Sequence, residues 1–356
     1  MNFNLLIFLA VFSFSLISLN MPKALAHTKC KISLPFGGWT EGCPHSHGGV
    51  IDNTPLDPDT WNPTDWIRSG AGEVCEANGT VTAERNRGRE QGLSPIQKDY
   101  LRPDFGNLVD EVTVVWGALL NDHITFQERI LNLGSEGQTY GNTIYIAEHK
   151  QPRSTKQLTL LAHEFKHVQQ YRGYGDLDTF CREYVRGLWG NGYEQNPLEI
   201  EAYNFDYSFA LSLRERLLPF SPSAELYYHS TPDWNRRSRI ELPSQLPGYI
   251  YFRNNCRYPL QFSLRYQDSS GNWRSEGSWN FEGNKSAYLV SEDQRLRSNN
   301  SIFYYYAEIT QEPYKDYRWT GDKDTEVGGR TLPMSETTLS PDSDGDYVLS
   351  LSCSNL

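Results

Sequence analysis

The sequence predicts an α+β core followed by a small antiparallel β-sandwich. Up to about residue 218 the sequence contains two strand-like runs among several helical segments, which is typical of a mixed core. Short β-rich runs separated by turn residues follow from Tyr249 onward, which is typical of a sandwich. We therefore expect folded domains at residues 93–218 and 248–356, joined by a proline-interrupted linker at residues 219–247.

The length and charge of the chain narrow its class. Its 356 residues fit two domains of ordinary size, and a hydrophobic content of 38% is enough for two cores. The net charge of −11 argues against nucleic acid as a partner, because nucleic acids select basic surfaces.

The amino terminus predicts export. An apolar run from Leu5 to Leu19 is short for a membrane span but suits a signal peptide. Ala24 and Ala26 form the small-x-small pattern of a cleavage site. We expect residues 1–26 to be removed and the secreted chain, extracellular or periplasmic, to begin at His27 without a membrane span. The alternative is an uncleaved anchor, because no Lys or Arg precedes the apolar run.

The six cysteines fit an oxidising compartment. Cys256 and Cys353 bracket most of the C-terminal region, and we expect them to form a disulfide. Residues 27–92 are rich in Gly, Pro, Asn, Asp and Thr, which predicts an irregular segment that contains disulfides. The remaining cysteines allow three pairings, among which the sequence does not choose: Cys30, Cys43, Cys75 and Cys181.

Local signals predict the first elements of the core. Ser94 before Pro95 is typical of a helix start, and the β-branched run at residues 112–116 predicts a strand. After a polar and helical interval, a Gly-Asn turn signal begins a second strand at residues 141–147. A long helix is then expected from Ser154 to Tyr171.

Two more helices complete the predicted core. Leu177 to Leu188 has a helical pattern. Asn196 in the cap position and Pro197 at the first helical position predict another helix that ends near Leu218. In the C-terminal domain, strands are expected at residues 250–252, 260–266, 286–290, 302–309 and 347–351.

The helix from Ser154 to Tyr171 carries the motif His163-Glu164-x-x-His167. Residues four apart share a helix face, so His163 and His167 can direct both imidazoles at one metal ion. The motif is typical of zinc hydrolases, in which the glutamate acts as general base on the attacking water. A chance match on an ordinary amphipathic helix is the alternative.

The helix that begins at Pro197 offers a third ligand, either Glu199 or Glu201. Residues two apart lie about 200° apart around a helix, so only one of the two can face the metal. We expect Glu199, because Ala202 on the same face lets the two helices approach closely. Glu201 is expected in solvent, where the helix dipole stabilises its charge.

An oxyanion that forms during hydrolysis needs a further hydrogen-bond donor. Tyr193 and Tyr203 are the candidates nearest to Glu199 in the sequence. The alternative is that either tyrosine belongs to the core or to the surface.

Together these segments resemble zincin-like metallopeptidases of the eCIS-core (extracellular contractile injection system core) type. The downstream Glu199-x-x-Ala202 is similar to the Glu-x-x-Ala of gluzincins. The other matching segments are Leu93-Ser94, Asp104-Phe105-Gly106, Val112-Thr113-Val114, Thr139-Tyr140-Gly141-Asn142-Thr143-Ile144-Tyr145, Leu160-Leu161-Ala162-His163-Glu164-Phe165-Lys166-His167-Val168-Gln169-Gln170 and Asn196-Pro197-Leu198-Glu199-Ile200-Glu201-Ala202.

The resemblance implies a minimal zincin core over residues 93–218. The strand at residues 142–147 would be the edge strand that aligns an extended substrate. The acidic residue that usually follows Glu-x-x-Ala is replaced by Tyr203, so we expect Asp206, one turn further on, to orient a histidine.

The sequence therefore predicts a secreted zinc metallopeptidase that acts on a peptide or protein substrate. Its C-terminal β domain is expected to bind a protein or a surface ligand. The alternative is a catalytically inactive binding protein on the same scaffold, in which the β domain mediates the interaction. The site residues are the Zn²⁺ ligands His163, His167 and Glu199, the base Glu164, and the candidate donors Tyr193 and Tyr203.

Overall fold

The structure is a computed structural model of the whole chain, and it divides into two compact units, Met1–Pro58 and Asp59–Leu356. In the first unit it describes an antiparallel pair, β1 (Lys31–Ser33) and β2 (Trp39–Glu41). In the second unit it describes residues 75–121, 123–126, 129–132, 135–191, 193–218 and 240–353. The expected signal peptide and the cysteines Cys30 and Cys43 lie outside the described residues.

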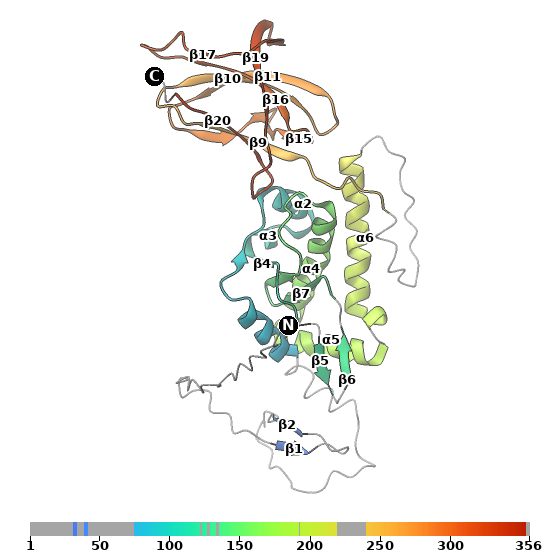
Figure 1. Cartoon of the computed structure of the whole chain (residues 1–356). Helices are drawn as coiled ribbons and strands as arrows, with labels where there is room; N and C mark the ends of the chain where they lie inside the picture. The colour runs from blue at the N-terminus through green and yellow to red at the C-terminus, as the bar shows by residue number, and fades with distance from the viewer. Residues whose placement is uncertain are drawn as a thin grey trace, which may run out of the picture. The chain divides into compact units, whose positions relative to one another are not determined.

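The core of the second unit begins with a four-stranded sheet (Figure 1). β4 (Thr113–Trp116) pairs in parallel with β8 (Thr143–Ile146), as expected for two strands of the core. β3 (Glu90–Gln91) and β7 (Gly137–Tyr140) pair antiparallel on the two outer sides. The edge next to β8 is therefore β7, and the expectation that residues 142–147 form the edge strand is wrong.

Helix α2 (Pro95–Phe105) starts where the sequence predicts it. The Ser94 side chain accepts a hydrogen bond from the Gln97 backbone N–H, and the Gln97 side chain accepts one from the Ser94 backbone N–H. This capping box satisfies two backbone donors that a helix start leaves unpaired. The short helix α3 (Leu108–Glu111) follows and leads into the sheet.

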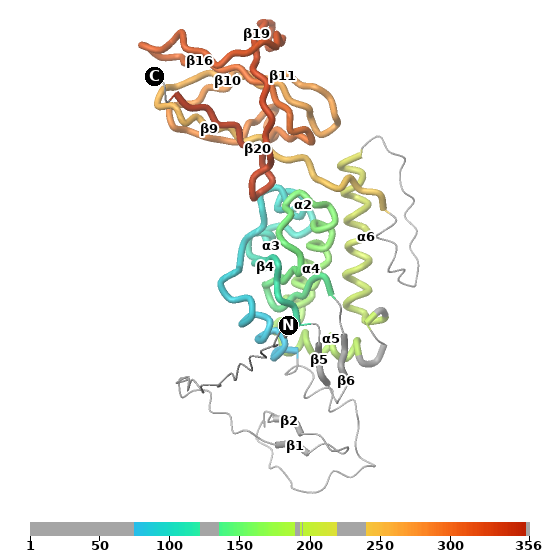
Figure 2. Tube along the Cα trace, in the orientation of Figure 1, coloured from blue at the N-terminus to red at the C-terminus, as the bar shows by residue number. Residues whose placement is uncertain are grey.

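The two longest helices, α4 (Thr155–Tyr174) and α6 (Pro197–Leu217), pack against each other (Figure 2). The Ser154 side chain caps α4, and the Asn196 side chain caps α6. Gly175 ends α4 in the left-handed region with φ 88°, a conformation that glycine adopts without a steric penalty. Both helices are confirmed, α4 being one turn longer than predicted.

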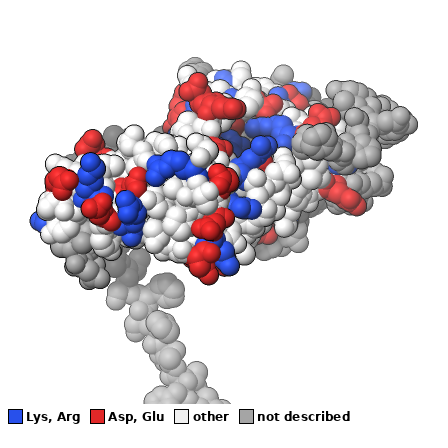
Figure 3. Space-filling view, turned by 90° about the horizontal axis from the view of Figure 1, so that it is seen from above, with Lys and Arg blue, Asp and Glu red and all other residues white. Residues whose placement is uncertain are grey.

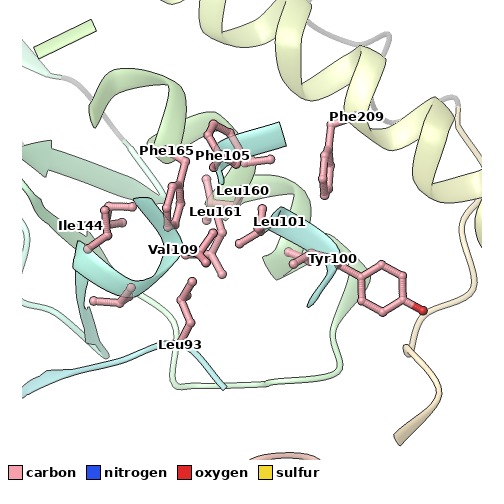
Figure 4. Packing of buried hydrophobic residues seen from close by; sticks show 14 of the residues in the cluster. Leu93, Tyr100, Leu101, Phe105, Val109, Ile144, Leu160, Leu161, Phe165 and Phe209 are labelled. Atoms are coloured by element: carbon pink, nitrogen blue, oxygen red, sulfur yellow. The ribbon is translucent and has the colours of Figure 1, made fainter. Parts of the chain in front are cut away.

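The hydrophobic core fixes α4 on the sheet and on α2 (Figure 4). Leu161 and Phe165 of α4 are fully buried, and the ring centroids of Phe165 and Phe105 lie 4.9 Å apart. Ile144 of β8 and Phe209 of α6 belong to the same cluster. Because α4 is enclosed on several sides, its remaining polar face is held rigidly in place.

Helix α5 (Leu177–Asn191) is joined to the N-terminal side of the core by a disulfide between Cys75 and Cys181. This disulfide is one of the pairings among which the sequence did not choose. Residues 75–85 are helical, and β3 pairs with β4, so the expectation of an irregular segment is wrong for residues 75–85 and 90–91.

The interval before β7 also differs from the prediction. Residues expected to be polar and helical form the antiparallel pair β5 (His123–Phe126) and β6 (Arg129–Asn132). The β-branched and aromatic residues of both strands favour this outcome.

The C-terminal domain is a β-sandwich, as predicted. Its strands are β9 (Gly248–Asn254), β10 (Leu260–Gln267), β11 (Trp273–Phe281), β12 (Ser286–Tyr288), β13 (Val290–Ser291), β14 (Gln294–Arg295), β15 (Arg297–Ser298), β16 (Ile302–Ile309), β17 (Arg318–Trp319), β18 (Lys323–Val327), β19 (Arg330–Thr338) and β20 (Tyr347–Leu351). One sheet has the strand order β11-β10-β16-β19-β18, with β17 paired to β16, and the other has the order β12-β9-β15, with β20 paired to β9.

Side chains from both sheets form one cluster, which includes Phe252 of β9 and Phe262 of β10. The expected Cys256–Cys353 disulfide is confirmed. The sandwich is not wholly antiparallel, because β20 pairs with β9 in parallel. The sequence also missed β11 and β19, whose largely exposed residues lack an apolar alternation.

Part of the expected linker is packed structure. Leu246 is fully buried in the core cluster of the helices, and its backbone N–H donates to the carbonyl oxygen of Arg153 at 2.6 Å. The Thr155 hydroxyl donates to the carbonyl oxygen of Pro243 at 2.6 Å. Residues 240–247 thus hold the start of α4, whereas residues 219–239 lie outside the described chain.

Acidic and basic side chains are interspersed on the face shown in Figure 3. Within the described ranges, no helix is long and apolar enough to cross a membrane.

Candidate metal centre

Helix α4 presents His163 and His167 toward one point. The two side chains lie on the face opposite the core residues Leu161 and Phe165. Their Nε2 atoms are 3.1 Å apart, and the residues are only 4% and 6% exposed. Two ring nitrogens this close, in a site nearly closed to water, require a proton or a metal ion between them.

Helix α6 supplies the third group. Glu199 lies in its first turn and is 2% exposed. Its Oε2 is 3.4 Å from Nε2 of His163, and its Oε1 is 3.5 Å from Nε2 of His167. Possible ligand atoms of the three residues all lie within 4.8 Å of one another, so the group could hold a metal ion.

The outward nitrogens of both histidines are engaged. Nδ1 of His163 lies 3.2 Å from Oδ2 of Asp206, which is the contact expected for that residue. Nδ1 of His167 lies 2.8 Å from Oε1 of Gln170. When Nδ1 donates, the lone pair of a neutral ring is on Nε2, the atom that can bind a metal.

The electrostatics of the group favour a bound positive charge. Burial alone would lower the pKa of His163, but the carboxylates of Asp206 and Glu199 beside the ring raise that pKa to about 10. Burial also acts to raise the pKa of Glu199, yet the two histidines lower it below its usual range. Oε2 of Glu199 is buried without a hydrogen-bond partner among the described residues. A cation in the centre would satisfy this oxygen.

Glu201 is turned away from the centre, in keeping with the argument from helix geometry. Its Oε1 pairs with Nζ of Lys166 at 2.8 Å, and its Oε2 accepts from Nε2 of Gln170 at 2.9 Å. About half of its side chain is exposed.

Glu164 lies between α4 and the edge strand β7. Its Oε2 accepts a hydrogen bond from the Thr139 hydroxyl at 2.7 Å. A Cβ added to Gly137 would lie 2.6 Å from its Oε1, so only glycine leaves room for the carboxylate here. Glu164 and the three candidate ligands line one pocket, about 610 Å³ including its open mouth, together with Thr139 of β7 and Tyr184 of α5.

The two candidate tyrosines occupy different places. Tyr193 lines the pocket, whereas the Tyr203 ring packs against the ring of His163 with centroids 4.5 Å apart. Their hydroxyl oxygens are 3.4 Å apart. Burial, reinforced by the charge of Glu199, raises the pKa of Tyr193, so its hydroxyl stays protonated at neutral pH.

Sequence reasoning missed three residues of the site. The Tyr184 hydroxyl donates to Oε1 of Glu199 at 2.6 Å, and Thr139 holds Glu164. No local pattern marks Tyr184, which reaches the site from another helix. Thr139 and Gln170 lie in segments that resemble the family, but the resemblance gave neither residue a role. Gln170 lies three positions after His167, so helix periodicity could also have indicated its contact.

The central part of this region matches a known family. Residues 98–175 match the family model of the eCIS core domain, which supports the resemblance seen in the sequence. The match covers most of α2, the strands β4, β7 and β8 of the sheet, and the helix α4 with both histidines. Comparison with curated proteins and with solved structures found no match to the chain.

Proposed function

We propose that this chain is a secreted zinc-dependent metallopeptidase. The observation that carries the proposal is the buried His163-His167-Glu199 group with Glu164 in the same pocket. Two imidazoles and one carboxylate are the donor set of catalytic zinc sites that leave a position open. A bound zinc ion would lower the pKa of a water ligand to about 7 and polarise a carbonyl group.

The chain's own residues would carry the remaining steps. Glu164, held by Thr139, would accept a proton from the attacking water and pass it to the leaving amine. Tyr184 would keep the Glu199 carboxylate oriented through its hydrogen bond. The protonated Tyr193 hydroxyl in the pocket would donate to the oxyanion, and Tyr203 would reach it only through Tyr193.

The edge strand supports a peptide as substrate. Among the described residues β7 pairs with β8 alone, so its other side is an edge at which an extended peptide can add as a further strand. Gly137 and Thr139 of this strand line the pocket with Glu164. A peptide aligned on β7 would therefore pass beside the general base.

The compartment and the domain roles are part of the same proposal. The disulfides Cys75–Cys181 and Cys256–Cys353 favour an oxidising destination. Residues 93–218 would form the catalytic domain, and the β-sandwich would bind a protein or a surface ligand.

Removal of metal tests the proposal. Purified protein is expected to cleave a mixture of quenched fluorescent peptides, to lose this activity on chelation, and to regain it with zinc. Fluorescence release and zinc content are measured in parallel. Zinc binding without cleavage of any peptide would favour the alternative of an inactive binding protein. Absence of zinc binding would exclude both the metallopeptidase and this alternative.

Gly137→Ala is expected to lower peptide hydrolysis by about 100-fold, because a displacement of a catalytic group by 1 Å can cost that much. The added methyl group would push away the Glu164 carboxylate, which is the flexible end of its side chain. Zinc content and melting temperature should change little. Gly173→Ala, whose added methyl meets nothing within 4 Å, is the matched control and should keep full activity.

A further inference from the structure

The hydrogen bonds of Gln170 fix which end of its side-chain amide faces His167. Gln170 is buried, with 8% of its surface exposed. Its Nε2 donates to the carbonyl oxygen of Leu198 at 3.0 Å and to Oε2 of Glu201 at 2.9 Å. Both partners are acceptors, so the amide nitrogen must point to α6 and the amide oxygen must point to His167.

This orientation determines the tautomer of His167. Oε1 of Gln170 lies 2.8 Å from Nδ1 of His167. An amide oxygen only accepts, so Nδ1 must carry the hydrogen and donate it. The neutral ring then has its lone pair on Nε2, the atom 3.5 Å from Oε1 of Glu199.

Glu201 holds Gln170 in this position. One carboxylate oxygen accepts from Gln170, and the other pairs with Nζ of Lys166 at 2.8 Å. Lys166, Gln170 and His167 all belong to α4, whereas Glu201 belongs to α6. The contacts therefore tie the orientation of a candidate ligand to the packing of the two helices.

We propose that Gln170, held by Glu201, is a positioning residue that presents Nε2 of His167 to the metal ion. The inference rests on the proposed zinc centre. His163 is held by a carboxylate, Asp206, whereas His167 is held by a neutral amide. A neutral partner orients the second ring without adding another negative charge to a buried site, where unpaired charge is costly.

Two variants separate this role from a merely structural one. Gln170→Leu keeps a similar volume and removes the hydrogen bonds to His167, Leu198 and Glu201. The double variant Gln170→Glu/Glu201→Gln has the same net charge as the unmodified chain. Its carboxylate at position 170 can accept a hydrogen bond from Nδ1 of His167 and another from the amide at position 201. Both variants lose the bond to Leu198.

Zinc affinity is measured by competition with a fluorescent chelator, with melting temperature as the test of folding. Gln170→Leu is expected to bind zinc about 10–100-fold more weakly than the unmodified chain, as for other lost outer partners of metal ligands. The double variant is expected to regain most of that affinity.

The possible results are distinct. Unchanged affinity of Gln170→Leu would overturn the positioning role and leave the zinc centre standing. A double variant as weak as Gln170→Leu would also overturn it, because the bond to Leu198 would then be the one that matters. Failure of the unmodified chain to bind zinc would remove the centre and this inference together.

Discussion

Glu199→Ala is expected to abolish stoichiometric zinc binding. The carboxylate is the candidate donor on α6, and without it only the two imidazoles of α4 remain in the candidate ligand set. The loss of affinity should exceed the roughly 10–100-fold that follows removal of an outer partner of a ligand. Metal content after dialysis, measured by mass spectrometry, should fall from about one zinc per chain to near zero.

Glu215→Ala is the matched control for this change. Glu215 is an exposed residue of the same helix and should keep full zinc content when it is replaced. The zinc affinity of Glu201→Ala is expected to lie between those of the other two variants, with one zinc bound at saturation, because Glu201 contacts Gln170 and is not one of the three candidate ligands. Full zinc content in Glu199→Ala would remove Glu199 from the ligand set.

Glu164→Gln is expected to lower peptide hydrolysis by about 10²–10⁴-fold, the usual contribution of a general base. The amide is similar in size and can still accept from the Thr139 hydroxyl, so the pocket should keep its form. It cannot take up a proton from water. Zinc content should stay the same, because Glu164 is not one of the three candidate ligands.

Glu136→Gln makes the same chemical change outside the pocket. Glu136 is exposed and pairs with Lys156 at the surface, so full activity is expected. Steady-state rates on one peptide, with zinc content measured on the same samples, give the comparison. A fully active Glu164→Gln variant would exclude Glu164 as the base.

The sequence by itself determined the features that depend on neighbours along the chain. Ser94, Ser154 and Asn196 mark helix starts because capping involves residues two or three positions away. The four-residue spacing of His163 and His167 likewise places both on one face of the helix, because this depends only on the helical repeat. The sandwich strands β9, β10, β12, β16 and β20 could be predicted from local β-rich runs between turn residues, whereas the other strands of this domain could not.

Only the tertiary structure decided which distant residues meet. It showed that β7, and not β8, is the edge strand, because strand order depends on pairing across the sheet. It joined Cys75 to Cys181, and it brought Tyr184 to Glu199 and Thr139 to Glu164. These contacts arise when separate elements pack around one core, and no short pattern in the chain records that packing.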